Sequence, residues 1–237
     1  MPGFGLIGTM DTFGTPHAMA AATMLPEGGV VVAGGGALDG STADDGVYRL
    51  EFPDTSALRL DRVTDLPGPR AGAAATTVTI DGINRVLISG GRTVASDRGT
   101  NAALAMIFDP ISNTIGWREP MSVARSEHVA VHLENGRVLL AGGWIGGGDA
   151  PDRATFEFFD SNSRSLLAGG SLDVPSVGLA AASLGPDGVL VCGGGVLNGT
   201  VLEPSAACNR VSLTGQVTQA ADMPGPRMGH ALSLIHI

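Results

Sequence analysis

The sequence predicts an all-β protein built from repeated antiparallel sheets, and three observations lead to this fold class. Four apolar runs rich in β-branched residues each end in a pair of glycines, as expected for strands that leave a core through positive φ angles. The first glycines of these pairs, Gly34, Gly90, Gly142 and Gly193, lie 56, 52 and 51 residues apart. No stretch of about ten residues shows a convincing 3.6-residue period, so helices are not expected.

A second marker keeps the same phase as the glycine pairs. An apolar residue stands seven positions before one recurring position: Met10 before His17, Leu66 before Ala73, Met121 before His128, Leu172 before Leu179 and Met223 before His230. The spans from this position to Gly34 and to Gly90 both cover 17 residues, against 14 in the later two repeats, so two longer hairpins are expected. The repeats are expected over about 17–72, 73–127, 128–178 and 179–229, with 230–237 starting a fifth.

The strands are clearest in the third repeat. They are predicted over 128–133, 137–141, 155–159 and 166–168, and Asn135-Gly136 is typical of the tight turn between the first two. A period of this length suits one four-stranded sheet per repeat. Four-stranded meanders with glycine-rich inner strands pack radially, so we predict a single β-propeller domain of four complete blades and partial terminal strands.

The repeats resemble kelch repeats, in which paired glycines are followed by an aromatic-Asp turn, a Trp and an Arg-x-x-His sequence. The second repeat matches this pattern best, with Phe108-Asp109-Pro110, Trp117, Met121, Arg125 and His128 in order. The third keeps Phe159-Asp160 but has Ala168 in place of the Trp and Ser176 in place of the Arg. The resemblance implies a propeller like the central domain of galactose oxidase. Kelch propellers usually close with six or seven blades, so it also implies an incomplete chain.

The last six residues, Leu232-Ser233-Leu234-Ile235-His236-Ile237, resemble one translated frame of a transposase adapter used in sequencing libraries. This resemblance favours a fragment. Two alternatives stay open: the ending is the natural first strand of a blade, or 6–9 and 230–237 complete each other by ring closure.

Composition and charge exclude several classes of partner. The 237 residues include 14 basic residues, all Arg, and 23 acidic residues, for a formal net charge of −9. This balance disfavours nucleic acids and anionic membranes, and no apolar run reaches the roughly 20 residues of a membrane span. No signal peptide is visible. Arginine without lysine is typical of high-GC bacterial genomes, where kelch-like chains are often exported, so a secreted or cell-surface location is weakly favoured.

Cys192 and Cys208 are expected on neighbouring strands of the fourth repeat. Two cysteines are too few to staple a fold of this size, so the sequence leaves open a single disulfide or two small buried side chains. The redox compartment stays open for the same reason.

The recurring histidines and arginines are interpreted as structural residues. His17, His128 and His230 share one repeat position, which indicates packing or a turn hydrogen bond, and His132 lies too far along its strand, roughly 13 Å, to share a metal with His128. Three arginines stand three residues before the recurring position, and they either hold the turns between blades or bind an anion: Arg70, Arg125 and Arg227.

The loops after the glycine pairs are the predicted binding surface, because loops on a rigid scaffold carry function. They should emerge on the same face as the connections between blades. The residues expected there are Arg92, Asp97, Arg98, Trp144, Asp149, Asp152 and Asn198. An exposed Trp144 would stack on a sugar or anchor a peptide, and its alternative role is packing against a neighbouring blade. The acids of these loops are expected to be solvated, so no metal or other cofactor is predicted.

Two functions remain open. The first is a binding scaffold for a protein or glycan, without catalytic residues in this stretch, because no titratable cluster converges. The single tyrosine, Tyr48, cannot supply a galactose-oxidase-like copper site. The alternative is that the chain belongs to a larger secreted carbohydrate-active enzyme, an oxidase, lyase or epimerase, whose catalytic residues lie outside it.

Overall fold

The computed structural model describes residues 18–37, 39, 41–51, 59–97, 100–145 and 154–233, and these form an all-β structure of consecutive antiparallel sheets. The first sheet contains β1 (Ala21–Met24), β2 (Val30–Ala33), β3 (Gly46–Glu51) and β4 (Arg59–Asp65). The second contains β5 (Ala71–Ile80), β6 (Ile83–Arg92), β7 (Leu104–Asp109) and β8 (Thr114–Pro120).

The third sheet contains β10 (Val129–His132), β11 (Arg137–Ala141), β13 (Thr155–Asp160) and β14 (Ser165–Ser171). The fourth contains β15 (Val177–Ser183), β16 (Val189–Asn198), β18 (Cys208–Val211) and β19 (Val217–Ala220). Two short strands, β9 (Arg125–Ser126) and β12 (Trp144–Ile145), pair with each other, and β17 (Val201–Pro204) pairs with the end of β16. A 3-10 turn, Gly185–Asp187, lies between β15 and β16. The strands predicted in the third repeat are confirmed.

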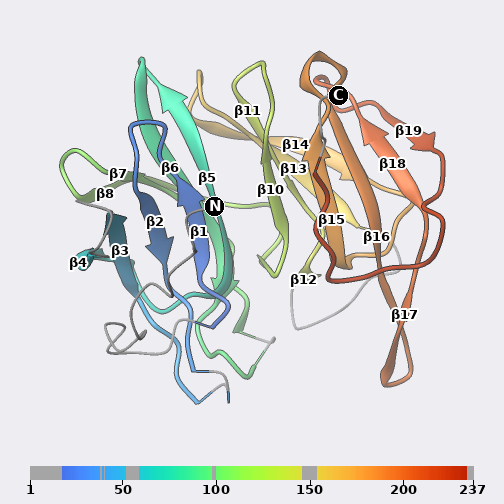
Figure 1. Cartoon of the computed structure of the whole chain (residues 1–237), viewed down its shortest axis with the longest axis horizontal. Coiled ribbons are helices and arrows are strands. Elements are labelled where there is room, and N and C mark those ends of the chain that lie inside the picture. Colours follow the sequence, from blue (N-terminus) through green and yellow to red (C-terminus); the bar gives the residue numbers. More distant parts are fainter. Residues whose placement is uncertain are drawn as a thin grey trace, which may run out of the picture.

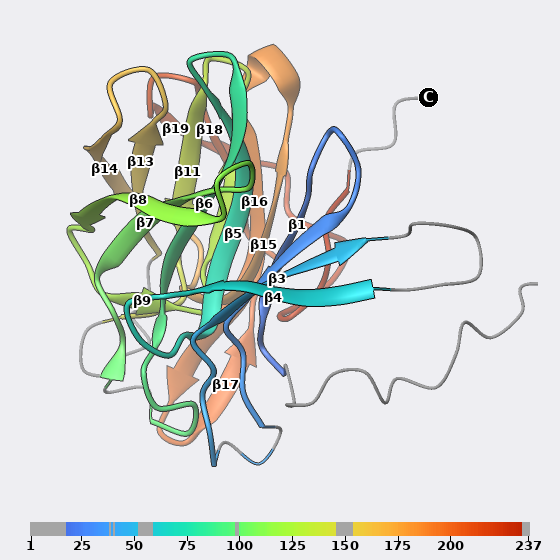
Figure 2. The same ribbon diagram turned by 90° about the vertical axis from the view of Figure 1, so that its left-hand side faces the viewer.

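The sheets lie one after another across the molecule, from the first at the blue end to the fourth at the red end (Figure 1). In a view turned by 90°, the β17 hairpin projects at the lower end of the molecule (Figure 2). Within each sheet the strands follow chain order, so every sheet is a meander. Among the described residues no strand of the first sheet pairs with one of the fourth, so the sheets do not close into a ring.

Each interface between neighbouring sheets holds its own apolar core. In β11, Val138 and Leu140 pack toward the second sheet, whereas Leu139 and Ala141 pack toward the fourth. Side chains alternate between the faces of a strand, and both faces are buried here, so the strand must be apolar throughout. This explains the uninterrupted apolar runs that precede the glycine pairs.

The glycine pairs mark the closest approach between one sheet and the connection that leads to the next. A Cβ on Gly34 would lie 2.1 Å from the carbonyl oxygen of Arg70, and one on Gly90 would lie 2.2 Å from that of Arg125. The second glycine of a pair then donates a hydrogen bond to the same kind of carbonyl, as Gly35 does to Arg70 and Gly194 to Arg227. Only glycine fits these positions, because the φ angles are positive and there is no room for a side chain.

A second line of hydrogen bonds links the starts of the sheets. A residue at or just before the start of each sheet, and one after the fourth sheet, has a left-handed conformation, with φ between 56 and 68° at the five positions Met19, Gly72, Glu127, Gly178 and Gly229. The amide of Gly72 donates to the carbonyl of Met19, that of Glu127 to Gly72, and that of Gly229 to Gly178. This line therefore continues past the fourth sheet.

The first hairpin corrects one expectation. In β1 and β2, Ala21 pairs with Ala33, so the register brings Ala20, not His17, opposite Gly34. The first hairpin therefore matches the third and fourth in length, and the second alone is longer, with β5 and β6 ten residues each. Alanine at this position carries no distinguishing signal, which is why the sequence pattern selected His17. His17 itself lies outside the described residues.

We expect Gly90→Ala to lower the free energy of unfolding by more than about 2 kcal/mol, because the methyl group would collide with the Arg125 carbonyl at a positive φ. Gly116→Ala in β8 is the matched control, since a Cβ there meets nothing within 4 Å. Urea unfolding of both variants measures the difference. Equal stability would show that the glycine pair is not the contact that fixes neighbouring sheets.

Candidate ligand-binding site

The loops that follow the glycine pairs lie at the same end of the sheets as the connections between sheets, as predicted. Backbone hydrogen bonds join the two sets in every repeat. The amide of Leu66 donates to Asp45, Met121 to Ala103, Leu172 to Ala154 and Met223 to Ala206. We call this the connection end.

Two of the predicted binding residues at the connection end are buried, so the expectation of an exposed surface there is wrong for them. Trp144 is 6% exposed, and its strand β12 pairs with β9 of the preceding connection. Arg92 is 3% exposed, because its guanidinium binds the Ala95 carbonyl and the Glu127 carboxylate. The exposed Trp144 ring proposed for stacking is thus replaced by the alternative, a packing role.

The other predicted loop residues are exposed or lie outside the described part of the chain. Asp97 is exposed, and Asn198 is exposed on the β16–β17 hairpin, where its amide donates to Glu203. Arg98, Asp149 and Asp152 lie outside the described residues. The structure does not bring Asp97 and Asn198 together, because they belong to the second and fourth sheets.

Arg125 holds the second sheet to the third. Its side chain is fully buried and donates to the carbonyls of Gly142 and Thr155 and to the Glu157 carboxylate at 3.3 Å. Burial lowers the pKa of Arg125, and the charge of Glu157 opposes this shift. The other oxygen of Glu157 accepts the amide of Ser122 at 2.9 Å. The predicted turn-holding role is therefore present at this position.

Arg70 occupies the equivalent position one sheet earlier but has no carboxylate partner there. Met106 stands where β13 carries Glu157, and Pro67 stands where Ser122 donates its amide, so donor and acceptor are lost together. The Arg70 guanidinium donates to the Pro69 carbonyl, and burial lowers its pKa. Arg227, the third arginine of this set, is exposed.

We expect Arg125→Met to cost about 3–5 kcal/mol in unfolding free energy, because it leaves the Glu157 carboxylate buried without its cation. Arg70→Met should cost less than about 1 kcal/mol. The double variant Arg125→Met/Glu157→Gln should recover part of the loss, because the neutral amide removes the buried charge and keeps an acceptor for the Ser122 amide, as Asn209 does for Asp173. Chemical denaturation of all three variants tests this, and equal costs for the two arginines would contradict it.

His128 is a buried structural histidine. Its Nε2 is hydrogen-bonded to the Ser89 hydroxyl at 2.8 Å across the interface of the second and third sheets. Burial, reinforced by the charge of Arg125, lowers the pKa of His128 to about 3. The imidazole is therefore neutral at neutral pH, which agrees with the packing role expected from its recurrence.

Because the pKa of His128 is depressed in the folded state, its contribution to stability is complete above its ordinary pKa of about 6.5 and is lost as the pH falls toward 3. We expect the free energy of unfolding of Ser89→Ala/His128→Leu to fall less steeply with decreasing pH than that of the parent protein, because the group with the depressed pKa is removed. The fold should accept this pair, because it copies Ala141 and Leu179 of the next interface. Urea midpoints at several pH values between about 7 and 4 measure the slopes. Parallel slopes would contradict the prediction.

Two open hollows lie at the opposite end of the sheets, at the hairpin turns. The larger, of about 640 Å³, is formed by the β5–β6, β10–β11 and β13–β14 turns. Its polar side chains are Thr79, Asp81, His132, Glu134, Asn135, Ser161 and Asn162. We call it the turn groove. Desolvation lowers the pKa of His132, so its neutral ring offers one donor and one acceptor at neutral pH.

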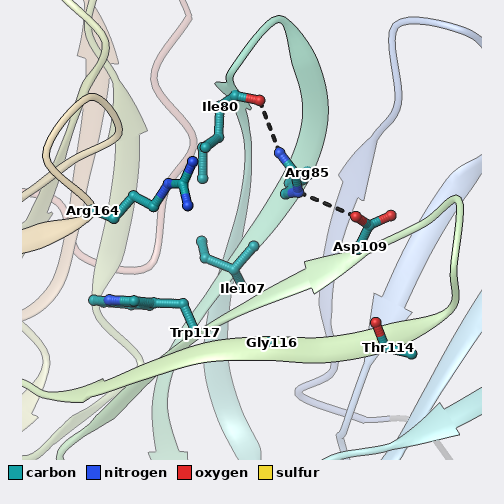
Figure 3. A pocket seen from close by; sticks show the side chains of 8 residues that line it. All are labelled: Ile80, Arg85, Ile107, Asp109, Thr114, Gly116, Trp117 and Arg164. Atoms are coloured by element: carbon teal, nitrogen blue, oxygen red, sulfur yellow. Dashed lines mark hydrogen bonds and ion pairs between the residues drawn. The ribbon is translucent and has the colours of Figure 1, made fainter.

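The smaller hollow, of about 220 Å³, lies between the outer strands of the second sheet and the β13–β14 turn. Figure 3 shows the Trp117 ring and the Arg164 side chain on one side of it, with Arg85 on the other. The Trp117 ring also packs against Phe159 of the third sheet, with centroids 5.1 Å apart. We call it the Trp117 pocket.

The polar wall of the Trp117 pocket is held by a bond that recurs in the next sheet. Arg85 donates to Asp109 at 3.2 Å and to the Ile80 carbonyl, and Arg137 donates to Asp160 at 3.1 Å in the third sheet. Burial alone would raise the pKa of Asp109, but the amides of the following turn and the Arg85 guanidinium outweigh it, so the pKa is lowered. The carboxylate is therefore charged and fixed.

An ion pair separates the two hollows. Asp81, in the lining of the turn groove, pairs with Arg164, in the lining of the Trp117 pocket. Both side chains are half-exposed or more, so the pair stabilises the fold little and can rearrange around a ligand. The two hollows are neighbouring parts of one candidate site.

The residues of this site were not singled out as ligand contacts from sequence. Asp81-Gly82, Glu134-Asn135-Gly136 and Asp160 to Arg164 are ordinary turn sequences, and Trp117 was identified only as part of the repeat pattern. One sequence feature does point to this site. The span from Ala73 to Gly90 is longer than in the later repeats, and this longer hairpin extends the β5–β6 turn that lines the groove. Among the described residues, no three His, Cys, Asp or Glu side chains are grouped to hold a metal ion, and no helix is long and apolar enough to cross a membrane.

Comparisons with known proteins concern the fold. No family model and no curated protein matches the sequence. The solved structure of YjhT is similar, with a TM-score of 0.63 over 90% of this chain and 68% of that chain, at 15% sequence identity. At this identity the likeness supports a shared fold and carries no ligand or reaction to this chain.

Proposed function

We propose that the protein is a kelch-type β-propeller that acts as a non-catalytic binding scaffold for a neutral glycan. The consecutive four-stranded meanders, the recurring glycine contacts and the likeness to YjhT support the propeller. The turn groove carries the functional part of the proposal, because seven polar side chains from two adjoining sheets line one hollow of about 640 Å³.

The chemistry of the groove favours a neutral ligand rich in hydroxyl groups. Carboxylate, amide, hydroxyl and imidazole groups supply both donors and acceptors, which suits the mixed hydroxyl groups of a sugar. The residues that line the groove include Asp81 and Glu134 and no arginine, so an anionic ligand is disfavoured there. The adjoining Trp117 ring offers an apolar face for a sugar ring.

A rigid framework supports this site. Asp160 and Asp109 fix the turns beside it through backbone amides, and Asn135 donates to the Leu213 carbonyl of the fourth sheet. The lining groups are thus positioned before a ligand binds, which lowers the entropic cost of binding. The site proposed here replaces the connection-end loops, where Trp144 and Arg92 are buried.

We expect short neutral oligosaccharides, tested as cello-, malto-, xylo- and chito-oligosaccharides by calorimetry and NMR, to bind at millimolar concentration or below. His132→Ala/Glu134→Ala should weaken binding at least about tenfold, because it removes two hydrogen-bonding side chains from the groove. Thr218→Ala/Gln219→Ala, on exposed positions of β19, is the matched control and should bind normally. Absence of binding to every sugar, or equal loss in the control, would refute the glycan proposal.

A further inference from the structure

The fourth sheet carries a disulfide next to its glycine pair. Cys192 of β16 and Cys208 of β18 stand opposite each other and are bonded, and both are buried. Cys192 directly precedes Gly193. The positions before the other glycine pairs hold Ala33, Ser89 and Ala141.

The side chain that packs against each first glycine comes from the following connection. A Cβ on Gly90 would lie 2.9 Å from Cε1 of His128, and one on Gly193 would lie 2.6 Å from Cε1 of His230. The two imidazoles therefore occupy the same place in the second and fourth sheets. In the third sheet Leu179 fills this place, since its Cδ2 would lie 2.4 Å from a Cβ on Gly142.

The residue before the glycine pair matches the side chain in this place. Ser89 faces His128 and is hydrogen-bonded to its Nε2 at 2.8 Å, whereas Ala141 stands beside Leu179. Cys192 occupies the position in the fourth sheet that Ser89 occupies in the second, with His230 in the place of His128. In the disulfide, however, Cys192 has no proton to donate, and both ring nitrogens of His230 are buried without a partner among the described residues. Such unsatisfied buried groups are costly and rare in folded proteins.

We propose that Cys192, Cys208 and His230 form a reversible thiol–disulfide site, in which reduction frees the Cys192 thiol to hydrogen-bond His230 in the place where Ser89 bonds His128. The reductant is a dithiol. One of its thiolates attacks a cysteine sulfur and releases the other cysteine as a thiolate, which takes up a proton. The second thiol of the reductant then displaces the first cysteine, so the protein gains two thiols and the dithiol becomes a cyclic disulfide.

Reduction replaces the disulfide within the fourth sheet by a hydrogen bond to the connection that follows this sheet. It breaks the bond between β16 and β18 but lets Cys192 hold the connection that carries His230. The backbone of that connection is anchored independently, by Met223 to Ala206 and by Arg227 to Ser205. The fourth sheet can therefore keep its strand order in both states, and the gained hydrogen bond favours the reduced state about fivefold.

The test is the equilibrium of the full chain with mixtures of reduced and oxidised dithiothreitol, quenched by alkylation and read by mass spectrometry. His230→Leu, which copies Leu179, should shift the midpoint about fivefold toward the disulfide, because only the reduced state loses a bond. Ser89→Ala/His128→Leu is the matched control and should leave the midpoint unchanged. An unchanged midpoint in His230→Leu, or a shift toward the thiols, would overturn the proposal.

A second measurement avoids the disulfide altogether. In Cys192→Ser/Cys208→Ala the new hydroxyl should hydrogen-bond His230, whereas in Cys192→Ala/Cys208→Ala it cannot. His230→Leu should therefore destabilise the first background more than the second, which urea unfolding of the four proteins measures as a coupling. Equal destabilisation in both backgrounds would overturn the proposal even if one variant is poorly stable.

Discussion

The close contact between each glycine pair and the next connection sets the arrangement of the whole chain. The carbonyl oxygens of Arg70 and Arg125 approach Gly34 and Gly90 so closely that neither glycine could carry a Cβ. In three of the four pairs, the amide of the second glycine also donates to the carbonyl of the following connection: Gly35 to Arg70, Gly143 to Ser176 and Gly194 to Arg227. One sheet thus fixes where the next begins. The apolar cores between sheets can then form only with side chains of matching size.

The interfaces share this backbone arrangement but differ in how their buried polar groups are paired. Glu157 and Asn209, at equivalent positions, accept the amides of Ser122 and Asp173. In the second sheet the equivalent residues are Met106 and Pro67, and Pro67 has no amide hydrogen to donate. Ser89 with His128 and Ala141 with Leu179 vary in the same concerted way. A buried group is thus changed together with its partner, as the cost of an unpaired buried group requires.

The two ends of the sheets have different roles. At the connection end, backbone hydrogen bonds and the buried side chains of Arg92 and Arg125 join the sheets, so these two described arginines are not presented to a ligand. At the turn end, the hairpins need only to reverse the chain, and their polar side chains remain available around the turn groove and the Trp117 pocket. This division explains why the candidate site lies away from the loops that sequence patterns indicated.

The sequence by itself determined the repeats, the strands of the third repeat and the positive φ angles of the glycine pairs, because these depend on residue periods and local conformational limits that a single chain displays. It located the strands of the third sheet within a few residues and left the Cys192–Cys208 disulfide as one of two options. Only the tertiary structure decided that Trp144 and Arg92 are buried, that Arg125 pairs with Glu157 while Met106 occupies the equivalent position in the sheet of Arg70, and where the two hollows lie. Burial and cavities depend on how turns and side chains from separate repeats meet, and no period in the sequence records that meeting.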